Sequence, residues 1–337
     1  MKKELSYTLK VWQTVAIGAL LIVVILIVRI AFNVLLMALA GALIAIYFHG
    51  LGDLIQRKTK LNRKFAMALS IAGTFILVGA LLWFIGAKIQ TQVAELSNTL
   101  PHTISTAKAK LGETPAGQKV LEYSSGDNSK KLLDTATSFF NTSFGVLGDL
   151  YIILFLGIFF TASPSMYKDG MLVLVPKQHH ATGKNIIDRI SLSLKGWLKG
   201  MLYSMVLITI LITLGLTIIG IPVAMILGLI TGILEIIPNL GPLIAMIPGV
   251  LLALTISTNT AVIVALLYII SQTIVANIVT PLIQKKMINL PPALTLISQL
   301  IMGTLSGALG IILAVPLLAI VIILVDELYV KKINPVS

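Results

Sequence analysis

Long apolar blocks, separated by short runs rich in lysine and arginine, set the pattern of this chain. A helix that spans a bilayer needs about 20 apolar residues, each adding 1.5 Å. Blocks that reach or approach this length cover residues 11–28, 30–48, 65–87, 144–162, 201–219 and 261–284. The pattern predicts an all-α polytopic membrane protein.

The first two blocks are separated only by Arg29. As one straight helix they would extend about 57 Å, nearly twice the hydrocarbon thickness of about 30 Å. We therefore expect a tight turn near Arg29 and Asn33. Lys2 and Lys3 ahead of an apolar run also fit a cleaved signal peptide. A second apolar run follows at once, without a polar stretch of mature chain, which favours a retained membrane hairpin.

Two polar segments interrupt the predicted spans. Residues 88–143 hold acidic and basic side chains in near balance, and the parity of the crossings predicts a small extracytoplasmic helical segment there. Residues 163–200 are basic, which indicates a cytoplasmic segment. Apolar residues within it recur at helical spacing opposite lysine and arginine, so we expect an amphipathic helix in the plane of the membrane. These residues are Ile186, Ile187, Ile190, Leu194, Trp197 and Leu198.

Proline and glycine interrupt the apolar sequence of the C-terminal half. In the first broken block, arms over residues 222–237 and 243–256 flank Pro238-Asn239-Leu240-Gly241-Pro242. Helical arms of these lengths would measure about 24 and 21 Å, which is too short to cross the hydrocarbon core. We therefore expect a re-entrant hairpin here, and a second one in the broken block of residues 290–325.

The two broken blocks resemble each other. Pro222 precedes Gly241 by 19 positions, and Pro291 precedes Gly310 by 19 positions. Each block contains a G-x-x-x-G and follows an apolar block long enough to span the membrane. The number of crossings before each block gives the two hairpins opposite orientations in the membrane. An inverted repeat of helix plus hairpin is the sequence sign of a transporter core. Proline and glycine are also common in membrane helices for packing alone.

These elements predict about eight membrane segments, including the two re-entrant hairpins, arranged in five regions. The regions are N-terminal scaffold or oligomerisation spans (1–87), the extracytoplasmic polar segment (88–143), a fourth span with the amphipathic helix (144–200), the transport core (201–325) and a cytoplasmic tail (326–337).

Composition agrees with the membrane interpretation and narrows the chemistry. Of 337 residues, 57% are hydrophobic and 11% charged, against about 45–50% and 25% in soluble domains. The net charge of +12 would also fit a nucleic-acid-binding protein. The basic residues lie in short runs between apolar blocks, however, as expected for cytoplasmic loops, so we expect no nucleic-acid partner.

Enzyme signatures are not fulfilled. Gly112 and Gly117 have the spacing of a phosphate-binding loop, but Gln118 occupies the position of the required lysine. His179 and His180 have no acidic or cysteine partner nearby for a metal. The chain has no cysteine, which excludes disulfides and thiolate nucleophiles. We expect no enzymatic activity, no metal and no cofactor.

Polar side chains inside the apolar C-terminal half are candidates for a transport path. Glu235 is the one acid between Asp188 and Asp326, and an acid at mid-membrane costs about 2.5–3.5 kcal/mol on insertion scales. It lies three residues before Pro238, where unwound carbonyls can help to bind a cation. We expect Glu235 to bind the coupling proton or cation. The alternative is that Glu235 lies in water at the hairpin tip or pairs with an interfacial group.

The substrate is expected near Asn239, Gln272 and Asn277, although each amide alone could simply bond a neighbouring helix. The candidate transport and coupling positions are Glu235, Pro238, Asn239, Gly241, Pro242, Gln272, Asn277, Pro281, Gln299, Gly303, Ser306, Gly307 and Gly310.

Three strings of the C-terminal half resemble the autoinducer-2 exporter (AI-2E) family. They are Glu235-Ile-Ile-Pro-Asn-Leu-Gly-Pro-Leu-Ile-Ala-Met-Ile-Pro248, Asn277-Ile-Val-Thr-Pro281 followed by Lys285-Lys286, and Gly303…Gly307…Gly310-Ile-Ile-Leu-Ala-Val-Pro316-Leu. The order of spans and polar segments fits the family over nearly the whole chain. Asn239 stands where the family commonly has an aromatic residue, which leaves the choice of substrate open.

The resemblance implies a bacterial inner-membrane transporter that is a homo-oligomer, with a pentamer as one arrangement. Members export the furanone signal autoinducer-2, or exchange sodium (lithium) for protons, and the resemblance does not decide between these functions. Symmetric hairpins suggest a mobile block, by analogy with elevator-type carriers. A non-transporting membrane scaffold and an intramembrane enzyme are the remaining alternatives. We expect membrane lipid and a small solute, proton or sodium as partners, and cytoplasmic termini.

Overall fold

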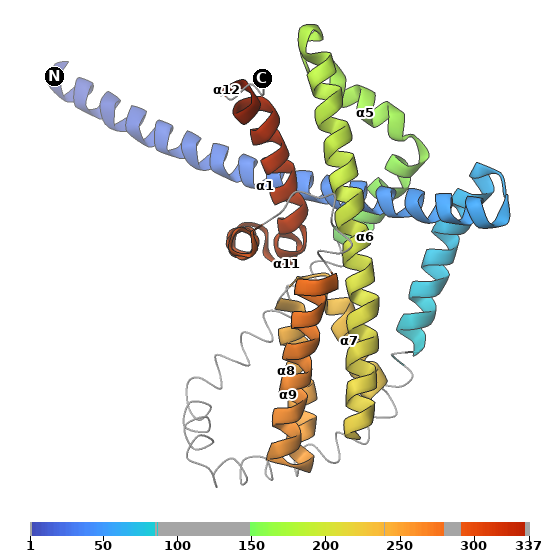
Figure 1. Cartoon of the computed structure of the whole chain (residues 1–337). Coiled ribbons are helices and arrows are strands. Elements are labelled where there is room, and N and C mark those ends of the chain that lie inside the picture. Colours follow the sequence, from blue (N-terminus) through green and yellow to red (C-terminus); the bar gives the residue numbers. More distant parts are fainter. Residues whose placement is uncertain (1, 85, 87–148, 239, 280–290, 334–337) are drawn as a thin grey trace.

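A computed structural model describes residues 2–84, 86, 149–238, 240–279 and 291–333 (Figure 1). These residues form helices and contain no strand, so the predicted all-α membrane fold is confirmed. Five of the described helices are long and apolar enough to cross a membrane, or six if one bent pair counts as a span. The predicted extracytoplasmic segment, 88–143, lies outside the described residues, and the count of eight segments stays a prediction.

The N-terminal helix α1, Lys2–Thr59, runs without a break through Arg29 and Asn33. The predicted tight turn at these residues is therefore wrong. The chain has no proline between residues 2 and 59, so nothing in the local sequence ends the helix. At 1.5 Å per residue, α1 extends about 87 Å. Its N-terminal half projects away from the other helices (Figure 1).

Two helices flank α1 near its C-terminal half. The chain turns at Lys60, which has a φ of 57°, and continues in the helix Arg63–Phe84, which matches the predicted third span. The Ser70 hydroxyl of this helix donates to the Phe48 carbonyl of α1 at 2.9 Å. The helix Asp149–Ala162 follows the undescribed segment and bends by 92° into α5, Pro164–Val173.

Helix α6, His180–Ile219, is a single helix of 40 residues that follows the short turn η1, Lys177–His179. The predicted in-plane helix is wrong, because its residues continue directly into the fifth span. Its apolar side chains, among them Leu194 and Trp197, are buried in a core with α1 and α11. Helical periodicity therefore identified the buried face correctly, but a protein core covers it instead of the membrane surface.

An ionic cluster joins the start of α6 to the end of the described chain. Arg189 donates to Asp326 at 2.7 Å and also to Glu327, and the Lys331 ammonium lies 2.5 Å from Glu327. Asp326 and Glu327 belong to the π-helical turn η3, Asp326–Val330, which leads into α12, Lys331–Ile333. The Glu327 side chain is only 6% exposed, and its contact with Arg189 holds the end of the described chain against α6.

The first broken block is a helical hairpin packed along α6. Helix α7, Ala224–Leu234, returns along α6 after a left-handed turn at Gly220. Helix α8, Leu240–Ile256, then packs against α7 and α9. A Cβ at Gly228 or Gly232 would lie within 2.0 Å of a threonine hydroxyl of α6, so this G-x-x-x-G allows α7 to approach α6 closely.

Helix α9, Thr258–Ile274, starts at Ser257, whose hydroxyl accepts from the Thr260 backbone N–H at 3.0 Å. It ends in a π-helical turn, η2, Val275–Val279. Helices α6, α8 and α9 lie along one another (Figure 1), with an apolar core that includes Ile208, Ile212 and Tyr268.

The second broken block, α11, Pro292–Val325, is divided at Gly307, where φ is 61° and ψ is −141°. Only glycine adopts this backbone conformation without strain. A Cβ at Gly310 would lie 2.1 Å from the Met302 carbonyl oxygen, although eight residues of straight helix would separate these positions by about 12 Å. The chain therefore folds back at Gly307, as predicted for a hairpin.

Candidate functional site

The tip of the first hairpin holds the buried acid that the sequence analysis selected. Glu235 follows the last residue of α7 and is 5% exposed. The backbone beyond it tightens: Ile237 N–H bonds to Leu234 O at 2.9 Å, and Gly241 N–H bonds to Ile237 O at 2.9 Å. Pro238 disfavours helix at the residue before it. The tip therefore ends α7 while keeping the Glu235 side chain in the protein interior.

The second arm closes on the first through a glycine. A Cβ at Gly241 would lie 1.8 Å from the Leu234 carbonyl oxygen. The second hairpin closes in the same way, with Gly310 against the Met302 carbonyl. Both hairpins thus use a glycine early in the second arm to approach a carbonyl near the end of the first arm. This shared device supports the predicted relationship between the two blocks.

Gln272 of α9 is a neighbour of Glu235. Its side chain lies close enough to interact with the Glu235 carboxyl group. One oxygen of each side chain, Glu235 Oε2 and Gln272 Oε1, is buried without a hydrogen-bond partner. The acid is therefore only partly satisfied by the protein.

Gln299 connects the two hairpins. This residue lies on the first arm of α11 and is 2% exposed. Its Nε2 donates to the Pro238 carbonyl oxygen at 3.0 Å, across 61 positions of sequence, and its Oε1 is buried without a partner. The structure thus brings Glu235, Gln272 and Gln299 to one tip.

Sequence analysis missed a second layer of polar groups beneath the tip. The hydroxyls of Thr231 and Tyr268 lie 3.5 Å apart, and both residues are almost fully buried. Thr231 precedes Glu235 by four positions, and Tyr268 precedes Gln272 by four positions. Residues four apart share a helix face, so this spacing could have identified both.

The other predicted positions that the structure describes do not contribute side chains to the group formed by Glu235, Gln272 and Gln299. Asn277 is exposed and donates to the Thr273 carbonyl of its own helix at 3.0 Å. Pro242 is buried behind the tip, and Gly303 faces Ile311 within the second hairpin. The Ser306 hydroxyl, beside the Gly307 turn, is buried without a partner. Asn239 and Pro281 lie outside the described residues.

The arrangement can bind a proton donor or a cation. Three unpartnered oxygens surround the tip, from Glu235, Gln272 and Gln299, and a buried acceptor without a partner costs about 1–3 kcal/mol. A proton, an alkali cation or a hydroxyl-bearing solute would satisfy them. Across the residues that the structure describes, no three His, Cys, Asp or Glu side chains group as a metal site would require.

Long apolar helices, two hairpins broken at proline and glycine, and a buried acid between them define a multi-pass helical membrane protein. The family described as "AI-2E family transporter" matches residues 18–330, and the chain belongs to this family. Its function is therefore membrane transport.

Two proteins of Bacillus subtilis (strain 168) are similar to the chain. "Putative transport protein YueF" is 29% identical over 285 residues, which cover 77% of this chain and 76% of that protein. "Putative transport protein YrrI" is 35% identical over 86 residues, which cover 26% of this chain and 24% of that protein.

Proposed function

We propose that the protein is a secondary transporter that exports a small polar solute of the autoinducer-2 type, coupled to a proton or cation gradient. The observation that supports this most is the buried Glu235 carboxyl group, which keeps one oxygen without a partner at the tip of a broken hairpin. Intramembrane acids mark ion paths and proton relays. Broken segments near mid-membrane are where secondary transporters bind their substrates and coupling ions.

Each polar group at the tip has a distinct role in this proposal. Glu235 binds the coupling proton or cation. Gln272, on the neighbouring α9, orients its carboxyl group. Gln299 links the second hairpin to the Pro238 carbonyl, so that movement of one hairpin alters the polar surroundings of the other. Helices α6 to α11 then move as a block against α1, in the manner of an elevator-type carrier.

A sodium (lithium)/proton antiporter is the second candidate. The three unpartnered groups at the tip are all oxygens, and oxygen ligands with unwound carbonyls are what transporters use to hold sodium. In this version, protons and alkali cations compete for Glu235, and no organic solute is needed.

The proposed location is the inner membrane of a bacterial cell, with the turn at Lys60, residues 177–199 and the C-terminus in the cytoplasm. Basic residues at positions 57–64 and 177–199 support this orientation of the loops. For the N-terminus, Lys2, Lys3 and Lys10 favour the cytoplasm. The continuous α1 opposes this placement, because a single crossing by α1 puts the N-terminus on the side opposite the Lys60 turn.

The test is a flux assay in liposomes that contain only the purified protein. Autoinducer-2, other small polar solutes, Na⁺ and Li⁺ would each be loaded, with and without an imposed pH gradient. We expect efflux of a polar solute that exceeds efflux from protein-free liposomes and depends on the gradient. Movement of Na⁺ or Li⁺ against protons, without solute efflux, would select the antiporter. A folded protein that moves none of them would contradict both candidates and favour a scaffold.

A further inference from the structure

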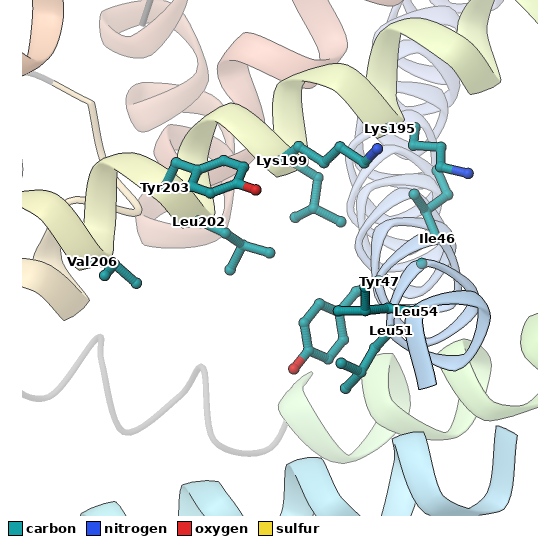
Figure 2. A pocket seen from close by; sticks show the side chains of 11 residues that line it. Ile46, Tyr47, Leu51, Leu54, Lys195, Lys199, Leu202, Tyr203 and Val206 are labelled. Atoms are coloured by element: carbon teal, nitrogen blue, oxygen red, sulfur yellow. The ribbon is translucent and has the colours of Figure 1, made fainter. Parts of the chain in front are cut away.

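A groove between α1 and α6, separate from the hairpin tip, combines an apolar interior with two lysines. Its volume is about 270 Å³. The apolar wall from α1 includes Ile46, Leu51 and Leu54, and Leu198 and Leu202 of α6 face it. Lys195 and Lys199, one helical turn apart on α6, lie at one end of the groove (Figure 2).

The position of the groove on α6 places the lysines at the edge of a membrane. Residues 201–219 of α6 carry no charged side chain, whereas Lys199 lies about 3 Å and Lys195 about 9 Å before this apolar stretch begins. Tyr47 and Tyr203 line the groove from opposite helices (Figure 2). Tyrosine concentrates where hydrocarbon meets the headgroups, so the groove crosses that boundary.

The charge of the groove is not neutralised within the described protein. Neither Lys195 nor Lys199 takes part in any of the ion pairs found among the described residues. The lining contains no acidic side chain, since Asp53 is not among the residues that line it. The ligand that complements two positive charges beside an apolar groove at headgroup level is an anionic amphiphile.

We propose that this groove binds an anionic phospholipid, with the phosphate at Lys195 and Lys199 and an acyl chain along the apolar wall. Basic pockets between membrane helices bind phosphate headgroups in this way. The Tyr47 hydroxyl shares a 3.2 Å hydrogen bond with the Thr74 hydroxyl of the helix Arg63–Phe84, which holds its ring in place. The lipid would join α1 to α6, and thus the N-terminal helix to the start of the hairpin block.

Lipid retention by the purified full-length chain tests the charged end of the site. Delipidated protein would be incubated with cardiolipin, phosphatidylglycerol or phosphatidylcholine, and bound lipid measured by native mass spectrometry. We expect the anionic lipids to bind and phosphatidylcholine not to bind. Lys195→Gln with Lys199→Gln should weaken binding about 30-fold, since each lysine contributes about 1 kcal/mol and a factor of ten corresponds to about 1.4 kcal/mol.

Lys177→Gln with Lys184→Gln is the matched control. These two lysines are exposed and lie outside the groove, Lys177 in η1 and Lys184 in the first turns of α6. It should bind lipid like the wild type. Equal loss in the two double variants, equal binding of phosphatidylcholine, or displacement of the lipid by inorganic phosphate alone would each overturn the proposal.

Gly50→Leu tests the apolar end independently of charge. Gly50 lines the groove, and a Cβ there would have no atom within 4 Å. A leucine should therefore fill the acyl-chain position without disturbing the fold, and should lower retention of anionic lipid at least tenfold. Unchanged lipid retention would indicate that no acyl chain occupies the groove. Loss of oligomers without loss of lipid would indicate that a second copy of the chain occupies it. Either result would contradict the proposal.

Discussion

At the scale of residues, the hydrogen bond from Gln299 to the Pro238 carbonyl connects the two hairpins. Gln299 is almost completely buried and donates to the Pro238 carbonyl, which belongs to the tip of the other hairpin. Buried amides in membrane proteins contribute about 0.6–2 kcal/mol through such bonds. Because Pro238 lies three residues after Glu235, the bond holds the tip that carries the acid.

Gln299→Leu removes this bond while keeping the size of the side chain. We expect a folded protein whose flux is about 3- to 30-fold lower, the equivalent of 0.6–2 kcal/mol, measured in proteoliposomes. Asn277→Leu is the matched control, because Asn277 is exposed and bonds only to its own helix. Wild-type flux in Gln299→Leu, or an equal loss in the two variants, would exclude a role for the link.

The sequence predicted the acid and both glutamines, but not which of them meet. Glu235 was identifiable because it is an isolated charge in an apolar block, and Gln272 and Gln299 because they are amides in apolar surroundings. Asn277 had the same signature, yet it follows Gln272 by five positions and faces away from it on the helix. The Gln299–Pro238 contact spans 61 positions, and no local pattern encodes it.

At the scale of elements, two predictions were wrong because they relied on local hydropathy. A break at Arg29 and an in-plane helix ending near Gly200 were predicted from the length and polarity of the apolar blocks. Neither site contains a proline, and both α1 and α6 continue through it. The breaks within the two hairpins, at Pro238 and Gly307, coincide with residues that interrupt helical geometry. For the two hairpins, proline and glycine were therefore a better guide to breaks than hydropathy.

The close approach of each hairpin's arms gives a stability prediction. Gly241→Ala and Gly310→Ala would place a methyl group within 2.1 Å of a carbonyl oxygen, and such overpacking typically costs 1–3 kcal/mol. We expect each variant to unfold at a lower temperature in detergent, as followed by scanning fluorimetry.

Gly79→Ala provides the comparison for these two variants. Gly79 lies within the helix Arg63–Phe84, and a Cβ there would have no atom within 4 Å. Alanine favours helix over glycine by about 1 kcal/mol, so this variant should be as stable as the wild type or more stable. If all three variants unfold alike, the arms of the hairpins do not approach as closely as described.

At the scale of the whole molecule, the helix Arg63–Phe84 fixes the relative sides of two polar segments. It is long and apolar enough to cross once, so the turn at Lys60 and residues 88–143 should lie on opposite sides. Because the chain has no cysteine, single-cysteine labelling is clean. Ser125→Cys should react with an impermeant maleimide in intact cells, and Thr59→Cys only after permeabilisation. Reaction of Ser125→Cys only after permeabilisation would reverse the proposed topology.

The exposed apolar surface of α1 supports a second prediction at this scale. Leu20, Ile30 and Leu35 are each more than 60% exposed, and only 6% of the apolar window of this helix is buried. Either lipid or another copy of the chain must cover this surface. We expect a homo-oligomer held by the N-terminal helices, with a mass that is a multiple of 36.2 kDa. A monomeric mass, both in mild detergent and in lipid nanodiscs, would refute this assembly.

The central claim is that Glu235 couples transport to a proton or cation. The most direct measurement is the pH dependence of flux in proteoliposomes for the wild type, Glu235→Gln and Asp188→Asn, with folding checked by gel filtration. Asp188→Asn removes an exposed acid, 59% exposed and 3.5 Å from Lys168, and should behave as the wild type. Glu235→Gln keeps the shape of the side chain and should lose most of the flux and its dependence on pH. A folded Glu235→Gln variant that transports at the wild-type rate with an unchanged pH profile would contradict the account.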